Sequence, residues 1–325
     1  MFRFRCRVPQ KNTIAILNYG NFECENYGAV LTAYALSKFL RLHGFNVKNI
    51  DYIPTFYKER VGVLTDFRVE YLPMTHRVST MRDLRKLNDD FETFIVGSDQ
   101  VFNQDFVRRE NGIYYLKFVD RHARKIAAAA SFGTNRFMGN KREKRRVRKL
   151  LYRFDAISVR EATGVDILRD MGLDGTCILD PVFLIDWDDV VSDYKPNGVF
   201  YYSIWPQVQK LAGDGNTFAS GMKLQDWLAG IKNAELFVTD SFHGICFAII
   251  FGTPFVPLAV LNDLRIERLY NIFDAVGIPR DKIISPDADI DWQHLEKYAI
   301  VPHINKRFSE LRRFAQNWIL NAIKG

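Results

Sequence analysis

Apolar and polar positions alternate along this chain with two different periods, one typical of strands and one typical of helices. The run Thr13–Leu17 predicts a strand, residues 29–42 predict a helix that His43-Gly44 ends, and residues 45–52 predict the next strand. Further strands are predicted at residues 93–96, 125–130, 156–159, 176–179, 199–204, 235–239 and 255–261. Strand, helix and strand repeated in this way predict parallel sheets covered on both faces.

The strongest internal boundary lies between residues 179–181 and 196–198, where proline, glycine and several aspartates gather. At about 150 residues per domain, the length of 325 residues also suggests two domains. We therefore expect an N-terminal lobe over residues 1–185 and a C-terminal lobe over residues 186–305. Apolar residues at helical spacing in the tail predict a terminal helix, residues 306–325, that packs across the lobes.

Composition narrows the class of protein. Apolar residues make up 47% and charged residues 26%, which excludes a disordered or fibrous chain. The net charge of +7 is a mild basic excess, and it is compatible with nucleic acid, an anionic small molecule or an acidic membrane surface. No recognised nucleic-acid motif accompanies the charge, so nucleic acid is not an expected partner.

The cysteines and the N-terminus bear on location. Four cysteines lie far apart with no C-x-x-C pair, which favours a reducing compartment over a disulfide framework or a zinc site. The basic first seven residues lack the apolar stretch of a signal peptide. The sequence therefore predicts a cytoplasmic protein.

Small polar residues follow several of the predicted strands. Ligands of doubly wound sheets bind at the carboxyl ends of strands, so these positions are candidate site residues. They include Ser98, Asp99 and Gln100 after one strand and Ser131 after another. Helix capping by Ser98, Asp99 or Ser131 is the alternative interpretation.

Two further strand ends have side chains that can bind an anion. Arg160 follows a strand directly and could hold a carboxylate or phosphate, or pair with Glu161 at the surface. The segment 239–244, Thr-Asp-Ser-Phe-His-Gly, follows another strand and opens an apolar helix, predicted at residues 245–251. A helix N-terminus favours an anion, and this one adds the imidazole of His243.

Taken together and in order, several segments resemble the polysaccharide pyruvyl transferase family. They are Asn26-Tyr27-Gly28-Ala29-Val30-Leu31, Phe94-Ile95-Val96-Gly97-Ser98-Asp99-Gln100-Val101, Ala129-Ala130-Ser131-Phe132-Gly133, Ser158-Val159-Arg160-Glu161, Leu179-Asp180-Pro181, Thr239-Asp240-Ser241-Phe242-His243-Gly244 and Arg265-Ile266-Glu267-Arg268-Leu269. The resemblance covers about residues 13–280. It implies an α/β fold of two Rossmann-like lobes with parallel sheets, GT-B-like, with the active site in the cleft between the lobes.

The same resemblance implies transfer of pyruvate from phosphoenolpyruvate to a sugar of a bacterial surface glycan, forming a ketal. The sugar acceptor could be lipid-linked or nucleotide-linked. No cofactor is expected, because the donor carries its own leaving group. No metal is expected, because the six histidines include no H-E-x-x-H motif and no close pair. Contact with the inner face of the plasma membrane remains an open expectation.

Roles follow from the chemistry that ketal formation needs. The donor anion needs cations and N–H groups, its methylene carbon needs a proton, and two sugar hydroxyls must lose theirs. We expect Arg160, Ser241, His243 and Gly244 to bind the donor and His243, Asp99 and Asp240 to be catalytic. The expected acceptor-binding residues are Asn26, Tyr27, Gly28, Ser98, Gln100 and Ser131.

Two alternative functions stay open. Ser241 stands where many family members have an arginine, and the stretch between Ile204 and Trp227 is short for a strand–helix unit. A glycosyltransferase that uses a nucleotide sugar on the same fold, or a non-catalytic protein of glycan synthesis, would be compatible with these departures. The run Lys141–Lys149 holds seven basic residues in nine and is interpreted as the solvated face of an amphipathic helix, with an anionic lipid surface or an acidic glycan as its candidate partners.

Overall fold

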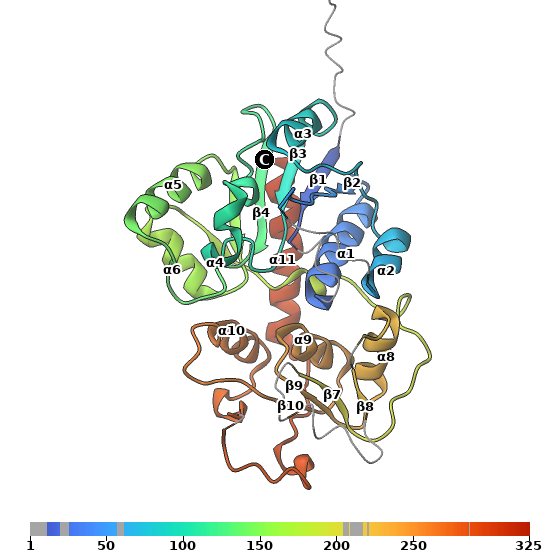
Figure 1. Ribbon diagram of the computed structural model, residues 1–325. Helices are drawn as coiled ribbons and strands as arrows, with labels where there is room; N and C mark the ends of the chain where they lie inside the picture. Colours follow the sequence, from blue (N-terminus) through green and yellow to red (C-terminus); the bar gives the residue numbers. More distant parts are fainter. Residues whose placement is uncertain are drawn as a thin grey trace, which may run out of the picture. The chain divides into compact units, whose positions relative to one another are not determined.

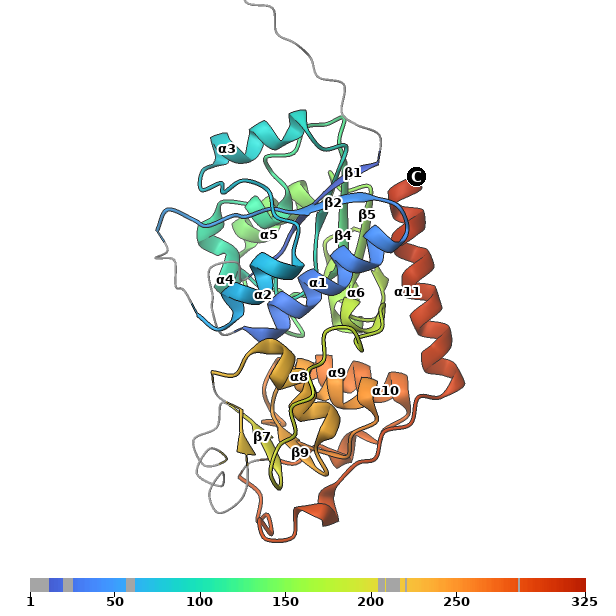
Figure 2. The same ribbon diagram turned by 90° about the vertical axis from the view of Figure 1, so that its right-hand side faces the viewer.

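The computed structural model describes residues 12–19, 26–56, 62–203, 208, 217–219, 221–285 and 287–325. The chain forms two compact units (Figures 1 and 2). The first unit comprises the chain up to Ile185 together with Phe314–Gly325, and the second comprises Asp186–Arg313. Each unit has its own parallel sheet and its own helices.

The sheet of the first unit has six parallel strands in the order β2-β1-β3-β4-β5-β6. Their bounds are β1 Thr13–Leu17, β2 Asn46–Asn49, β3 Thr93–Val96, β4 Arg124–Ala130, β5 Ala156–Val159 and β6 Thr176–Cys177. Every residue of β1 and β3 is buried, as expected for central strands covered on both faces. The strand order reverses between β1 and β3, and this switch point is where doubly wound sheets bind ligands.

Helices cover this sheet on both sides in Figures 1 and 2. They are α1 Tyr27–Leu42, α2 Leu64–Tyr71, α3 Met81–Lys86, α4 Gln104–Val107, α5 Lys141–Leu151 and α6 Ala162–Asp170, with 3₁₀ turns at Leu87–Asp89, Arg108–Glu110, Ile113–Tyr115 and Pro181–Phe183. Asn26 caps α1 by accepting the N–H of Ala29. Asn140 and Glu143 form a capping box that starts α5, whose residues Val147 and Leu151 are buried.

The second unit contains a four-stranded parallel sheet in the order β10-β9-β7-β8. Its elements are β7 Phe200–Tyr202, β8 Thr217–Phe218, α8 Leu224–Asn233, β9 Phe237–Thr239, α9 Phe242–Phe251, β10 Phe255–Pro257, α10 Glu267–Val276 and 3₁₀ turns at Arg280–Lys282 and Leu295–Tyr298. The strand order reverses between β7 and β9, so this sheet also has a switch point. The Phe247 ring packs edge-on against Trp187 and Trp227 in the core.

The C-terminal helix α11, Lys306–Lys324, contributes residues to both units. In the second unit Arg312 pairs with Asp186 at 3.0 Å. In the first unit the Gln316 side chain donates to the Leu184 carbonyl, and Arg124 donates to the Ala322 carbonyl.

Several sequence predictions of element bounds need correction. The strand expected over residues 45–52 is limited to Asn46–Asn49, because Asn49 and Tyr52 form bridges with residues 74 and 78 instead of extending the pairing with β1. Helix α9 begins at Phe242 rather than at residue 245, because the Ser241 hydroxyl accepts the Gly244 N–H. Strand β8 was not expected. Most of the stretch between Ile204 and residue 216, and the loop at residues 20–25, lie outside the described residues.

Within the described part of the chain, no helix is long and apolar enough to cross a membrane.

Candidate functional site

The switch point of the first unit is formed by the residues that directly follow β1 and β3. Asn18 follows β1, and its side-chain amide donates to Asn49 Oδ1 at 3.3 Å. Its Oδ1 is buried and accepts no hydrogen bond from any residue that the structure describes. A Cβ atom on Gly97 would lie 1.9 Å from that oxygen, so the approach of β3 to Asn18 requires glycine. A buried acceptor without a described partner is unusual, and at a switch point it marks Asn18 as a candidate site residue.

Asp99, two residues past Gly97, has a strained backbone. Its φ of 80° lies in the left-handed region, which a non-glycine residue seldom adopts. The Gln100 N–H donates to its Oδ1 at 2.9 Å, and Asn26 Nδ2 donates to its Oδ2 at 3.4 Å. The Asp99 carbonyl accepts the Ser131 N–H at 3.0 Å, which holds this conformation against β4. Backbone strain maintained by its surroundings is characteristic of functional sites.

Arg160 follows β5 and forms the centre of a buried cluster of carboxylates. Its side chain is 1% exposed, and Nη1 donates to Asp180 Oδ2 at 2.8 Å while Nη2 donates to Asp99 Oδ1 at 3.2 Å. Glu161 lies 3.8 Å away, and the Ser98 hydroxyl donates to the same Asp180 oxygen at 2.8 Å. Burial opposes the charge on Arg160, but the three carboxylates outweigh it and raise the pKa of the guanidinium.

Glu161 ties β4 to the same cluster. Its Oε1 accepts the Ser131 hydroxyl at 2.7 Å and the Phe132 N–H at 3.0 Å. A bulge in β4, with Ala129 at a φ of 53°, sets the direction of the chain into Ser131. The thiol of Cys177 is half-buried, and desolvation first and the nearby charge of Glu161 second raise its pKa to about 12. This thiol is therefore not a nucleophile near neutral pH.

The structure thus brings together the sequence-predicted residues of the first unit in one hydrogen-bonded network. Its members are Asn26, Ser98, Asp99, Gln100, Ser131 and Arg160. Tyr27 and Gly28 form the first turn of α1 and belong to this region through the cap at Asn26.

Sequence reasoning did not select Asn18, Glu161 or Asp180 as site residues. Both Asp180 and Glu161 belong to family segments, but the sequence places Asp180 at a domain boundary and offers Glu161 only as the alternative surface partner of Arg160. The signal that could have found them is that polar residues at the ends of adjacent buried strands need partners.

The switch point of the second unit has a smaller polar group of its own. Ser203 follows β7 and donates its hydroxyl to Asp240 Oδ2 at 2.9 Å, and Asp240 follows β9. The Thr239 hydroxyl donates to the Tyr202 carbonyl at 2.6 Å and accepts the Ser241 N–H at 3.0 Å. These bonds fix the turn from β9 into α9. Ser203 is a further residue that the sequence analysis did not select.

His243 lies in the first turn of α9 and is 7% exposed. The Phe242 ring packs edge-on to the imidazole, with centroids 5.0 Å apart. A Cβ on the neighbouring Gly244 would lie 2.9 Å from Thr239 Oγ1, so glycine is needed for the close approach of α9 to β9. The backbone around His243 is therefore tightly constrained, and its side chain is part of a packed environment.

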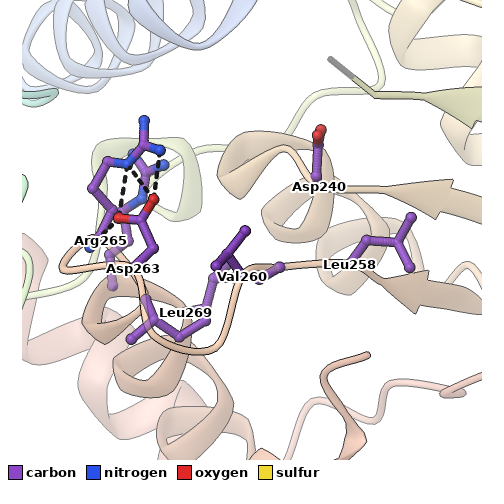
Figure 3. Close-up of a pocket in the computed structure, with 9 residues that line it drawn as sticks. Asp240, Leu258, Val260, Asp263, Arg265 and Leu269 are labelled. Carbon is purple, nitrogen blue, oxygen red and sulfur yellow. Dashed lines mark hydrogen bonds and ion pairs between the residues drawn. The ribbon is translucent and has the colours of Figure 1, made fainter. Parts of the chain in front are cut away.

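A cavity of about 100 Å³ opens beside Asp240 (Figure 3). Asp240 and the Arg265–Asp263 pair lie on opposite sides of it, with Leu258, Val260 and Leu269 below them in the view of Figure 3. Arg265 Nε lies 3.0 Å from both carboxylate oxygens of Asp263. This hydrogen bonding lowers the pKa of Asp263 and raises that of Arg265. The cavity therefore offers a carboxylate and a cation to a small polar group.

Metal ligation was not predicted from the sequence. Among the described residues, no three or more His, Cys, Asp or Glu side chains are grouped so that they could hold a metal ion.

Solved structures with a similar fold include UDP-GlcNAc 2-epimerases. One is the UDP-GlcNAc 2-epimerase from Methanocaldococcus jannaschii, with 11% identity, coverage of 96% of this chain and 99% of that chain, and a TM-score of 0.56. Another is the UDP-GlcNAc 2-epimerase from Neisseria meningitidis bound to UDP-GlcNAc, with 9% identity, coverage of 95% and 99%, and a TM-score of 0.54. At these identities the likeness shows the fold alone, and the fold is GT-B-like, as the sequence predicted.

The family follows from the sequence itself. The family model described as polysaccharide pyruvyl transferase matches residues 26–262. The chain therefore belongs to the polysaccharide pyruvyl transferase family, as its motifs indicated. No curated protein matches this sequence. Family membership makes the protein a transferase that acts on a glycan acceptor.

Proposed function

We propose that the protein transfers pyruvate from phosphoenolpyruvate to two hydroxyls of one sugar in a bacterial surface glycan. The methylene carbon of the donor gains a proton and becomes a methyl group, and C2 then forms bonds to both sugar oxygens. The bond from C2 to the phosphate oxygen breaks. Of the two hydroxyl protons released, one balances the proton that the methyl group gained and the other leaves with phosphate.

The observation that carries this proposal is the family match, because residues 26–262 include Asp99 and Arg160 of the first unit and Asp240 of the second. In the second unit, we assign Ser241, His243 and Gly244 at the start of α9 to the donor anion, because they belong to the matched family segment and lie at a helix N-terminus. His243 is the proposed proton donor to the methylene carbon or ligand of the phosphate. Asp240, held by Ser203, is a proposed acceptor of a hydroxyl proton.

In the first unit, the switch-point network is proposed to bind the acceptor. Asn18 Oδ1 and the carboxylate of Asp99 are oriented by fixed partners, and such acceptors suit sugar hydroxyls. The sequence analysis expected Arg160 to bind the donor, and this stays a prediction. Its buried contacts with Asp180 and Asp99 support a positioning role, in which it holds the Asp99 carboxylate in place.

A phosphate-release assay tests the proposal. Phosphoenolpyruvate is supplied with a panel of lipid-linked and nucleotide-linked sugars, and phosphate and ketal product are measured. We expect His243→Gln to lower kcat/KM by about 10²- to 10⁴-fold, the usual contribution of a general acid. The matched control is His122→Gln, because His122 is an exposed histidine of the first unit.

Binding separates the roles of the two residues. Isothermal titration of phosphoenolpyruvate is expected to show weakened binding to His243→Ala, and to Arg160→Ala if Arg160 contacts the donor. Unchanged affinity in both variants contradicts the donor assignment. Release of a nucleoside diphosphate from a sugar nucleotide would instead identify a glycosyltransferase, and binding without product would identify a non-catalytic protein.

A cytoplasmic location, with contact at the inner membrane surface, belongs to the same proposal. It is supported by the chemistry of the acceptor, because lipid-linked sugars are membrane-bound.

A further inference from the structure

A basic groove in the first unit lies between α5 and the end of α6, and none of its lining residues belongs to the switch-point network. It has a volume of about 570 Å³, which is in the usual range for ligand pockets. One wall is a stripe of α5 formed by Lys141, Lys144, Arg145 and Arg148, at positions i, i+3, i+4 and i+7. The other wall is the end of α6 with Asp170, Met171 and Gly172. Helices α5 and α6 are neighbours in Figure 1.

The groove keeps a strong positive charge. Lys144 forms an ion pair with Asp170. In the part of the chain that the structure describes, no carboxylate pairs with Lys141, Arg145 or Arg148. The four cations of α5 and the carboxylate of Asp170 together give the lining of the groove a net charge of +3.

Helix stability does not explain this pattern. Cations at i and i+4, such as Lys141 with Arg145 and Lys144 with Arg148, repel each other on a helix surface. Lys141 also lies in the first turn of α5, where the helix dipole disfavours positive charge. The apolar side of α5 is already packed into its own unit through Val147 and Leu151. A bound anion would reduce the repulsion between these cations. If the basic face of α5 contacted only solvent, nothing would require it to line a groove.

We propose that this groove binds phosphate groups. The guanidinium groups of Arg145 and Arg148 can each donate two hydrogen bonds to the oxygens of a phosphate. The lysines of the same wall add positive charge. A compact, highly charged anion such as a diphosphate fits a concave site with several converging cations. The phosphates could be presented by an anionic lipid headgroup or by a soluble ligand.

Two double variants with the same loss of charge test the proposal. Arg145→Gln/Arg148→Gln removes both guanidinium groups from the groove, and Arg142→Gln/Lys149→Gln removes two exposed cations of α5 that do not line it. Affinity for inorganic diphosphate is measured by isothermal titration at low ionic strength. Sedimentation with phosphatidylcholine vesicles, with and without phosphatidylglycerol, measures lipid binding. Circular dichroism and the unfolding temperature verify that both variants fold.

We expect the groove variant to lose about tenfold or more of its affinity, since one charge-assisted hydrogen bond is worth about a factor of ten. The control variant should change by less than about threefold, the scale of general charge screening. Vesicle binding that diphosphate displaces identifies lipid headgroups as the source, and diphosphate binding without vesicle binding identifies a soluble ligand. The proposal is overturned if neither probe binds, if both variants lose affinity equally, or if a polyuronate oligosaccharide binds more tightly than diphosphate.

Discussion

Replacing Arg160 by methionine removes the cation from the buried carboxylate cluster of the first unit. The side chains of Arg160 and Asp180 are each 1% exposed, and that of Asp99 is 9% exposed. Methionine retains much of the volume and leaves Asp180, Asp99 and Glu161 without their shared counter-charge. Breaking a buried ion pair by removing one partner costs about 3–5 kcal/mol.

Hydrogen exchange is the suitable assay, because a protein with two units need not unfold in one step. The free energy of opening is read from the exchange rates of peptides covering residues 96–103 and 157–162, which carry the cluster. A loss of 3–5 kcal/mol corresponds to exchange that is faster by about 10²- to 10⁴-fold. Arg160→Lys keeps the positive charge, but an ammonium group cannot bridge two carboxylates as the planar guanidinium does. We therefore expect it to lower the free energy of opening by less than Arg160→Met does.

The matched control is Arg169→Met, which breaks an ion pair with Asp166 whose side chains are 73% and 65% exposed. An exposed pair of this kind contributes about 0–1 kcal/mol. If Arg160→Met accelerates exchange no more than Arg169→Met does, Arg160 is not the counter-ion that holds the cluster, and the positioning role assigned to it is wrong.

Two further predictions concern the same unit. Gly133→Ala combines a φ of 72° with a Cβ only 2.1 Å from Gln100 Oε1, an atom held by a hydrogen bond from Asn103, so it should lower the free energy of opening of the first unit by about 2–4 kcal/mol. Gly44→Ala, with a φ of 83° and open space, should lose only the conformational part of about 1–2 kcal/mol. Equal losses in hydrogen exchange of the first unit would contradict the steric argument. Burial raises the pKa of Glu110 above its ordinary 4.5, and the hydrogen bond from Tyr52 offsets only part of this increase. The unfolded chain therefore loses this proton at a lower pH than the folded protein does, so stability falls as pH rises from 4.5 through the raised pKa. Glu110→Gln should therefore unfold at a higher temperature than the native protein near neutral pH, and this gain should vanish below pH 4.5; a gain that is independent of pH would refute the explanation.

Much of the secondary structure could be predicted from the sequence. The bounds of β1, β3 and β5 were predicted without error, because buried parallel strands are short, mostly apolar runs, and these three stop at Asn18, Gly97 and Arg160. The order of motifs also identified the family, which the match over residues 26–262 confirms.

The partners of the site residues depended on tertiary structure. Ser98 and Asp180 are 82 residues apart, and Ser203 and Asp240 are 37 apart, yet each pair is joined by a hydrogen bond. A strand's sequence indicates that it is buried but not which strand lies beside it, and hydrogen bonds between strand ends depend on that order. For this reason the sequence alone indicated that Arg160 follows a strand, while only the sheet order β3-β4-β5-β6 surrounded its guanidinium with carboxylates.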